Sequence, residues 1–196
     1  MINRLVLAYG PPKCGRHSAG KVLLSKHQWG HVSLRRSLLK VDEVYLGLGV
    51  VDMLRTSDTA DDDIAIPAFM LRIAECARIE AGKNVFFEGV FGRPTQVTRM
   101  IEHAARFAKH VEVVEFQLSD SEVWKRIGTS GDVRYKDLEF GHTIIAEYRR
   151  NQSTIKKLAE ARILKLGQKG SHYSIDAREP VHSIVSRIMK HGRKAA

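Results

Sequence analysis

Cysteine is scarce in this chain of 196 residues, which has two, Cys14 and Cys76. Two widely spaced cysteines provide neither a disulfide framework nor a C-x-x-C metal-ligand pair. We therefore expect free thiols in a reducing compartment and a cytoplasmic location.

Long apolar runs are also missing. No stretch approaches the roughly 20 apolar residues that are needed to span a bilayer. The apolar start at residues 1–9 runs directly into Gly10-Pro11-Pro12 without a small-residue cleavage site, so it predicts a strand rather than a secretory signal. We expect no membrane partner.

Two common catalytic patterns are absent as well. The nine histidines show no H-E-x-x-H spacing, so a zinc site is not expected from local spacing. No Gly-x-Ser-x-Gly occurs, which removes the nucleophile of an α/β-hydrolase.

Basic residues, in contrast, are abundant. Lysine and arginine total 32 against 22 acidic residues, a net charge of +10. A basic surface attracts polyanions, so the charge favours a nucleotide or nucleic-acid partner without choosing between them. No strand is rich in aromatic residues in the manner of RNA-binding sheets, so nothing indicates base-specific reading of RNA.

Apolar runs and helical patterns alternate along the chain. We expect strands at 4–9, 29–34, 85–87, 111–118 and 172–176, and helices at 15–27, 41–54, 61–81, 94–108, 121–127, 138–166 and 180–190. This alternation predicts an α/β fold with a five-stranded parallel sheet and helices on both faces, in one domain over 1–196. Two insertions are expected, at 35–80 and 128–138.

The segment between the first strand and the first helix matches the spacing of a phosphate loop. Gly10 and Gly15 fit G-x-x-x-x-G-K-[ST], with Arg16 at the lysine position. Glycines let the backbone approach the ligand, and the following helix N-terminus attracts anionic oxygens. The predicted nucleotide-binding residues are Gly10, Pro11, Pro12, Lys13, Cys14, Gly15, Arg16, His17 and Ser18.

Two other interpretations of this segment remain open. A second register, from Gly15 to Lys21, supplies the lysine but lacks the hydroxyl. The two glycines could also mark an ordinary strand, turn and helix. In the first register Ser18 can serve a magnesium ion if the pattern is G-K-x-[ST].

With these residues the chain resembles the nucleoside monophosphate kinases, adenylate kinase in particular. The family loop G-P-P-G-x-G-K-G-[TS] is similar to Gly10–Ser18, and D-G-F-P-R-T-x-x-Q is similar to Glu88–Gln96. The ending V-D-G-x-x-P-V is similar to Ile175–Val181. The resemblance implies a three-layer P-loop NTPase fold that binds ATP and Mg²⁺.

The resemblance also implies roles for individual residues. An acceptor would bind under the 35–80 insertion, with Gln96 reading its base, and 128–138 would form a short lid. The implied catalytic residues are Arg16, Arg93, Arg126 and Arg134. The implied acceptor-binding residues are Arg35, Arg36, Glu88, Gly89, Arg93 and Gln96. Ser18 and Glu88 would serve the magnesium ion, Glu88 through water.

Departures from the family pattern motivate a second hypothesis. Arg16 replaces the family's lysine, and the lid is short. Under this hypothesis the chain is a catalytically degenerate kinase-fold protein. It acts as a nucleotide-binding or RNA-binding subunit, or as a structural subunit of a ribonucleoprotein. Kinases that phosphorylate a hydroxyl usually need a carboxylate after the second strand, and residues 31–38 contain none, although Asp42 or Glu43 could supply it.

Overall fold

A five-stranded parallel sheet forms the centre of the molecule. The computed structural model describes residues 1–44, 61–131, 135 and 137–191. The strand order is β2-β3-β1-β4-β5, and every neighbouring pair is parallel. The strands are β1 (Ile2–Tyr9), β2 (Gly30–Ser33), β3 (Asn84–Glu88), β4 (Ala108–Gln117) and β5 (Gly170–Asp176). The predicted α/β fold with five parallel strands is confirmed.

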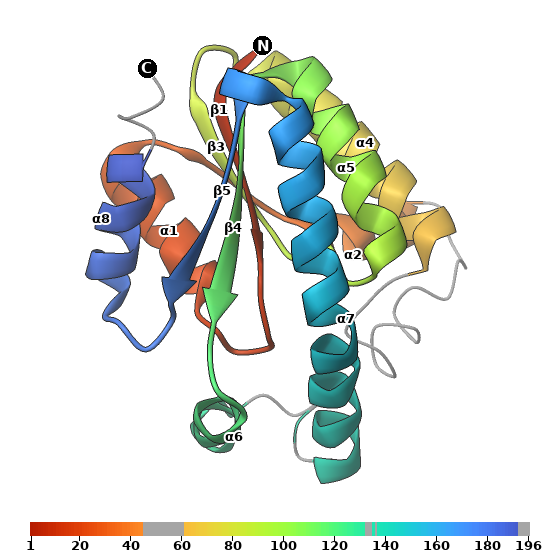
Figure 1. The fold of residues 1–196 in the computed structure, drawn as a ribbon, viewed down its shortest axis with the longest axis vertical. Helices are drawn as coiled ribbons and strands as arrows, with labels where there is room; N and C mark the ends of the chain where they lie inside the picture. Colours follow the sequence, from red (N-terminus) through yellow and green to blue (C-terminus); the bar gives the residue numbers. More distant parts are fainter. Residues whose placement is uncertain (45–60, 132–134, 136, 192–196) are drawn as a thin grey trace.

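Helices cover both faces of this sheet (Figure 1). On one face lie α1 (Arg16–His27) and α8 (Val181–His191), and on the other lie α4 (Asp62–Ile79), α5 (Pro94–Phe107) and α7 (Leu138–Lys165). The described residues also form α2 (Leu34–Val44), α6 (Asp120–Thr129) and the 3₁₀ turn η2 (Gly167–Lys169). The first turns of α7 and the whole of α6 stand beyond the carboxyl edge of the sheet (Figure 1).

The sheet separates two hydrophobic cores. Alternate residues of a strand point to opposite faces, so Leu5 and Leu7 of β1 pack with the α5 and α7 side, while Val6 and Ala8 pack with α1 and α8. All four are fully buried. A strand buried on both faces reads as a continuous apolar run, which is why β1 can be recognised in the sequence.

One predicted helix begins in the wrong place. The structure starts α2 at Leu34, directly after β2, rather than at residue 41. Most of the predicted 41–54 helix lies outside the described residues, as do 45–60 of the 35–80 insertion and 132–134 and 136 of the 128–138 insertion. The other elements begin and end within about three residues of the predicted bounds.

Two further expectations concern membranes and thiols. Among the helices described, none has the length and apolar character that crossing a membrane requires. Cys14 and Cys76 are both buried with free thiols.

Candidate functional site

A cavity of about 500 Å³ opens at the carboxyl ends of β1 and β3. The chain leaves β1, forms β2 and β3 on one side, and then crosses β1 to form β4 on the other. In open parallel sheets, ligands bind outside the carboxyl ends of the strands at such a switch point. A volume of this size is within the range of small-molecule sites, roughly 300–1,000 Å³.

The segment after β1 has a backbone that depends on glycine. Gly10, Lys13 and Gly15 all have positive φ angles, of 154°, 57° and 91°. A Cβ on Gly10 would lie 2.6 Å from the Phe116 carbonyl oxygen, so only glycine fits there. Because α1 begins at Arg16, and Arg16 and His17 both line the cavity, the positive end of the helix dipole faces it.

The structure brings part of the predicted loop to the cavity. The loop residues that line it are Gly10, Pro12, Lys13, Arg16 and His17. Within the described part of the chain, the lining does not include Pro11, Cys14, Gly15 or Ser18. Ser18 is exposed on α1, and Cys14 is buried in the core, where burial raises the pKa of its thiol. Cys14 is therefore a neutral core side chain rather than a nucleophile.

Cations from two elements line the same cavity. Lys13 and Arg16 come from the loop and the start of α1, and Arg35 and Arg36 come from the first turn of α2. The Lys13 ammonium lies 5.1 Å from the centre of the Tyr135 ring. This lining favours a ligand that carries several negative charges.

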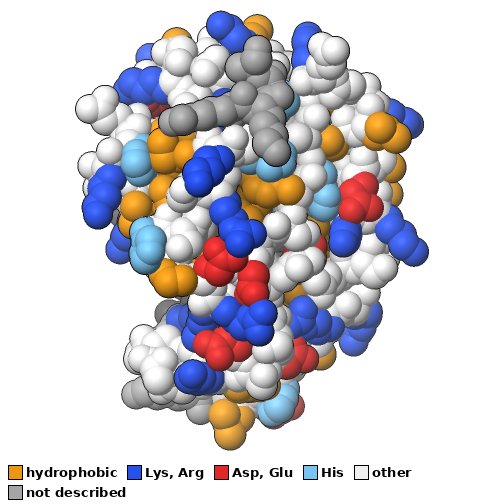
Figure 2. Space-filling model, turned by 60° about the vertical axis from the view of Figure 1, so that its left-hand side comes forward, with side chains coloured by type: hydrophobic (Ala, Val, Ile, Leu, Met, Phe, Trp, Pro, Cys, Tyr) orange, Lys and Arg blue, Asp and Glu red, His pale blue; other side chains and the backbone are white. Residues whose placement is uncertain are grey.

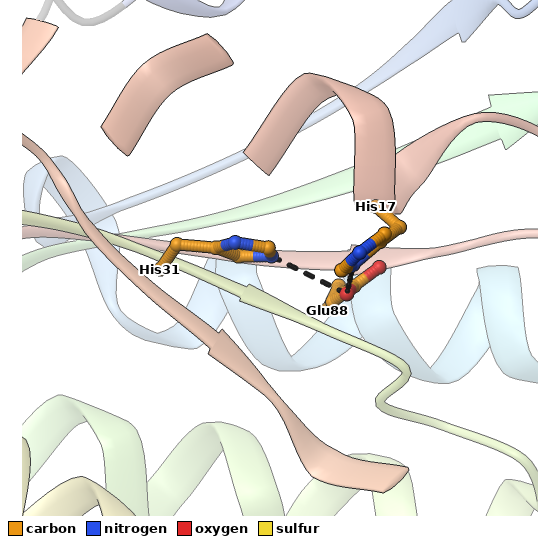
Figure 3. Close-up of side chains that lie close together, drawn as sticks. All are labelled: His17, His31 and Glu88. Atoms are coloured by element: carbon orange, nitrogen blue, oxygen red, sulfur yellow. Dashed lines mark hydrogen bonds and ion pairs between the residues drawn. The ribbon is translucent and has the colours of Figure 1, made fainter. Parts of the chain in front are cut away.

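Two glutamates, Glu88 and Glu147, also line the cavity, and Glu88 stands at the end of β3. Its Oε1 lies 2.7 Å from His17 Nδ1 and 3.3 Å from His31 Nε2 (Figure 3). Burial would raise the pKa of this carboxyl, but hydrogen bonds from His31 and His17 and the charge of Arg16 outweigh it and lower the pKa. Glu88 is therefore ionised at neutral pH.

Three different elements supply this cluster (Figure 3). His17 lies in the first turn of α1, His31 on β2 and Glu88 on β3. His31 pairs with Phe86 in the strand register, so His31 and Glu88 point to the same face of the sheet, toward α1. Gly20 of α1 makes room for the His31 ring, because a Cβ there would overlap the ring atoms.

Arg93 and Gln96 lie at the start of α5. The Arg93 guanidinium contacts the Asp61 carboxylate at 2.7 Å, and Arg93 is not among the described residues that line the cavity. Gln96 is buried and does line it. The Gln96 side-chain oxygen accepts hydrogen bonds from the N–H groups of Gly92 and Arg93, at 3.0 and 3.4 Å, and so caps α5.

Arg126 contacts the backbone of the loop rather than the cavity. Its guanidinium donates to the Lys13 carbonyl at 3.3 Å and to the Ala177 carbonyl at 2.7 Å. It therefore joins α6 to the loop after β1 and to the segment after β5. Arg126 is not among the described residues of the lining. The fourth predicted catalytic residue, Arg134, lies outside the described residues.

Five of the six predicted acceptor residues line the cavity. Arg35, Arg36, Glu88, Gly89 and Gln96 line it, whereas Arg93 does not. Sequence reasoning missed His31, because it lies 57 residues from Glu88 and shares no local pattern with it. The signal that could have identified His31 was its position in the fold. It is a polar residue on β2, which pairs with β3, and β3 ends in Glu88.

No protein-family model matches this chain, and no curated protein matches it.

Proposed function

We propose that the chain is a phosphotransferase that binds ATP at Gly10–Ser18 and moves its γ-phosphoryl group to a nucleoside monophosphate or a similar small acceptor. The observation that carries this proposal is that the loop after β1 and the basic start of α2 line one cavity at the switch point of the sheet. A donor phosphate and an acceptor phosphate would then share a positively charged space.

The cation arrangement suits this reaction. An acceptor oxygen forms a bond to the γ-phosphorus while the bond from that phosphorus to the bridging oxygen of ADP breaks. Catalysis of this step depends mainly on positioning and on neutralising negative charge. Lys13 and Arg16 lie in the loop and at the start of α1, and Arg35 and Arg36 lie at the start of α2.

Of the two residues predicted to serve Mg²⁺, one fits that role and the other does not. Mg²⁺ takes oxygen ligands, keeps several waters and binds largely through substrate phosphates. Glu88 lines the cavity and offers an ionised carboxylate that can act through water. Ser18 is exposed and does not belong to the described lining, so its hydroxyl does not fit the role.

A turnover assay tests the proposal. Purified protein is incubated with Mg²⁺-ATP and each nucleoside monophosphate in turn, and nucleoside diphosphate formation is measured. We expect turnover with one acceptor, and a decrease of about a hundredfold or more in Arg16→Ala, because phosphoryl transfer loses a cation at the phosphates. Arg106→Ala is the matched control, since Arg106 is exposed in the last turn of α5, outside the lining.

A second candidate function is a catalytically degenerate nucleotide-binding or RNA-binding subunit of a ribonucleoprotein. It is favoured by Arg93 and Arg126, whose guanidinium groups contact Asp61 and backbone carbonyls instead of lining the cavity. The net charge of +10 adds an attraction for RNA. On the face drawn in Figure 2, acidic side chains lie among the basic ones, so the described residues form no continuous basic patch there.

The same preparation distinguishes the two functions. Absence of turnover with every acceptor, together with RNA binding that weakens steeply with salt, would reject the phosphotransferase and support the subunit. Turnover that survives in Arg16→Ala at the level of Arg106→Ala would contradict the placement of the reaction at this loop.

A further inference from the structure

The cluster of His17, His31 and Glu88 has the composition of a transition-metal site. Among the described residues, one potential ligand atom from each lies within 4.8 Å of the other two. Two imidazoles and one carboxylate are a known ligand set of catalytic zinc sites, in which a fourth position stays open to water or substrate. Imidazole nitrogen favours Zn²⁺ over Mg²⁺, which prefers oxygen.

Two of the three distances between ligand atoms can be compared with those that a tetrahedral ion requires, and the third, between His17 and His31, is within 4.8 Å. Ligands at 2.0–2.1 Å from a tetrahedral Zn²⁺ lie about 3.3–3.4 Å from one another. His31 Nε2 and Glu88 Oε1 are already 3.3 Å apart. His17 Nδ1 and Glu88 Oε1 are 2.7 Å apart, so this pair would open by about 0.6 Å. The small adjustment falls on His17, whose side chain is 38% exposed, while those of His31 and Glu88 are 6% and 9% exposed.

The packing holds two of the three ligands in fixed positions. The His31 ring lies against Gly20 of α1 and beside the ring of Phe86. Glu88 is fixed at the end of a central strand. Ligands held on strands give a precise site at a low cost in conformational entropy. His17 and Glu88 also line the cavity, which gives an ion and its fourth ligand access from solvent.

We propose that His17, His31 and Glu88 bind a Zn²⁺-type divalent ion in the wall of the cavity, with one coordination position open to the cavity. This inference goes beyond the proposed phosphotransferase and does not depend on it, because the cluster exists without a nucleotide. An ion at this place would add two positive charges beside the Gly10–Ser18 loop.

The positive charge of Arg36 lies close enough to weaken the binding of a cation at His17. Replacing Arg36 therefore tests the proposed site. An Arg36 nitrogen lies 3.3 Å from His17 Nε2, and Glu88 meets the other ring nitrogen, Nδ1. Ligation through Nδ1 moves the ring proton to Nε2, so Arg36 must swing away. Arg36 is exposed, and this movement meets little resistance. We expect Arg36→Ala to bind Zn²⁺ about threefold more tightly or better, since one nearby cation is removed.

The experiment measures binding of Zn²⁺ alone to tag-free protein, without nucleotide, by calorimetry. The set comprises the wild type, His17→Ala, Glu88→Gln, His31→Gln, Arg36→Ala and His182→Ala. His182 is an exposed histidine of α8 and serves as the matched control. We expect one Zn²⁺ per chain in the wild type and in His182→Ala, and at least about tenfold weaker binding in the three cluster variants. Millimolar Mg²⁺ should not displace the ion.

Several outcomes would overturn the site. These are no binding to the wild type, equal binding to all variants, displacement by Mg²⁺, or unchanged or weaker binding in Arg36→Ala. If His31→Gln fails to fold, the partly exposed His17→Ala still decides the question. Because no nucleotide is present, a negative result leaves the turnover assay of the proposed phosphotransferase unaffected.

Discussion

Gly20 has no side chain, and the His31 ring of the candidate site occupies the space that a side chain would fill. Glycine inside a helix usually lowers stability by about 1 kcal/mol relative to alanine. At Gly20, however, the space that a Cβ would occupy is filled by the His31 ring, which is buried between α1 and the sheet. The local cost of glycine is therefore offset by a contact that places His31 against Glu88.

Gly20→Ala is accordingly expected to destabilise the protein, opposite to the usual effect in a helix. Overpacking typically costs about 1–3 kcal/mol, and overlap with a buried ring places this change in the upper part of that range, above the helix gain of about 1 kcal/mol. Gly128→Ala is the matched control, because Gly128 is in α6 and a methyl group added there would meet nothing within 4 Å. Urea unfolding should show a lower stability for Gly20→Ala and an equal or higher one for Gly128→Ala. A stabilised Gly20→Ala would mean that the His31 ring does not occupy this space.

At the scale of elements, a buried ion pair joins three strands and a helix. Arg4 of β1 pairs with Glu112 of β4 and also donates to the Ile188 carbonyl in α8. The Tyr173 hydroxyl of β5 donates to Glu112 at 3.2 Å. The Glu112 side chain is fully buried and that of Arg4 is 9% exposed, so each charge depends on the other.

We expect Glu112→Leu to lower the free energy of unfolding by about 3–5 kcal/mol, because it leaves the Arg4 charge buried without its partner. The double variant Arg4→Leu with Glu112→Leu should recover most of that loss, since no unpaired charge remains. Chemical denaturation of both variants and of Arg4→Leu gives the coupling between the two sites. Losses that simply add in the double variant would contradict the coupling.

The elements also show what the sequence can and cannot predict. β1 contains the apolar run Leu5–Tyr9, β4 carries valines and a phenylalanine between polar residues, and Pro94 marks the start of α5, so the sequence predicts these elements closely. The prediction extends the second strand to residue 34 and so misses the start of α2, although Leu34 and Leu38 are four residues apart, as on one face of a helix, and both pack into the core. Tertiary packing decides whether so short a segment continues the strand or begins the helix.

For the whole molecule, strand order determines which residues meet. The order β2-β3-β1-β4-β5 puts the ends of β1 and β3 side by side, so that a loop after residue 9 meets a carboxylate at residue 88. The sequence predicts both as candidate site residues. It does not predict that Arg93 faces Asp61, or that His31 completes a cluster with His17 and Glu88, because both depend on how distant segments pack.

The central claim is that the Gly10–Ser18 loop binds the phosphates of a nucleotide. It is tested most directly by titrating ¹⁵N-labelled protein with Mg²⁺-ATP and following the backbone amide signals by NMR. We expect saturable shifts that are largest at Gly10, Gly15 and Arg16, and a weaker affinity in Arg16→Ala than in Arg106→Ala. Saturable binding that shifts signals only outside the loop, or no binding at all, would contradict it.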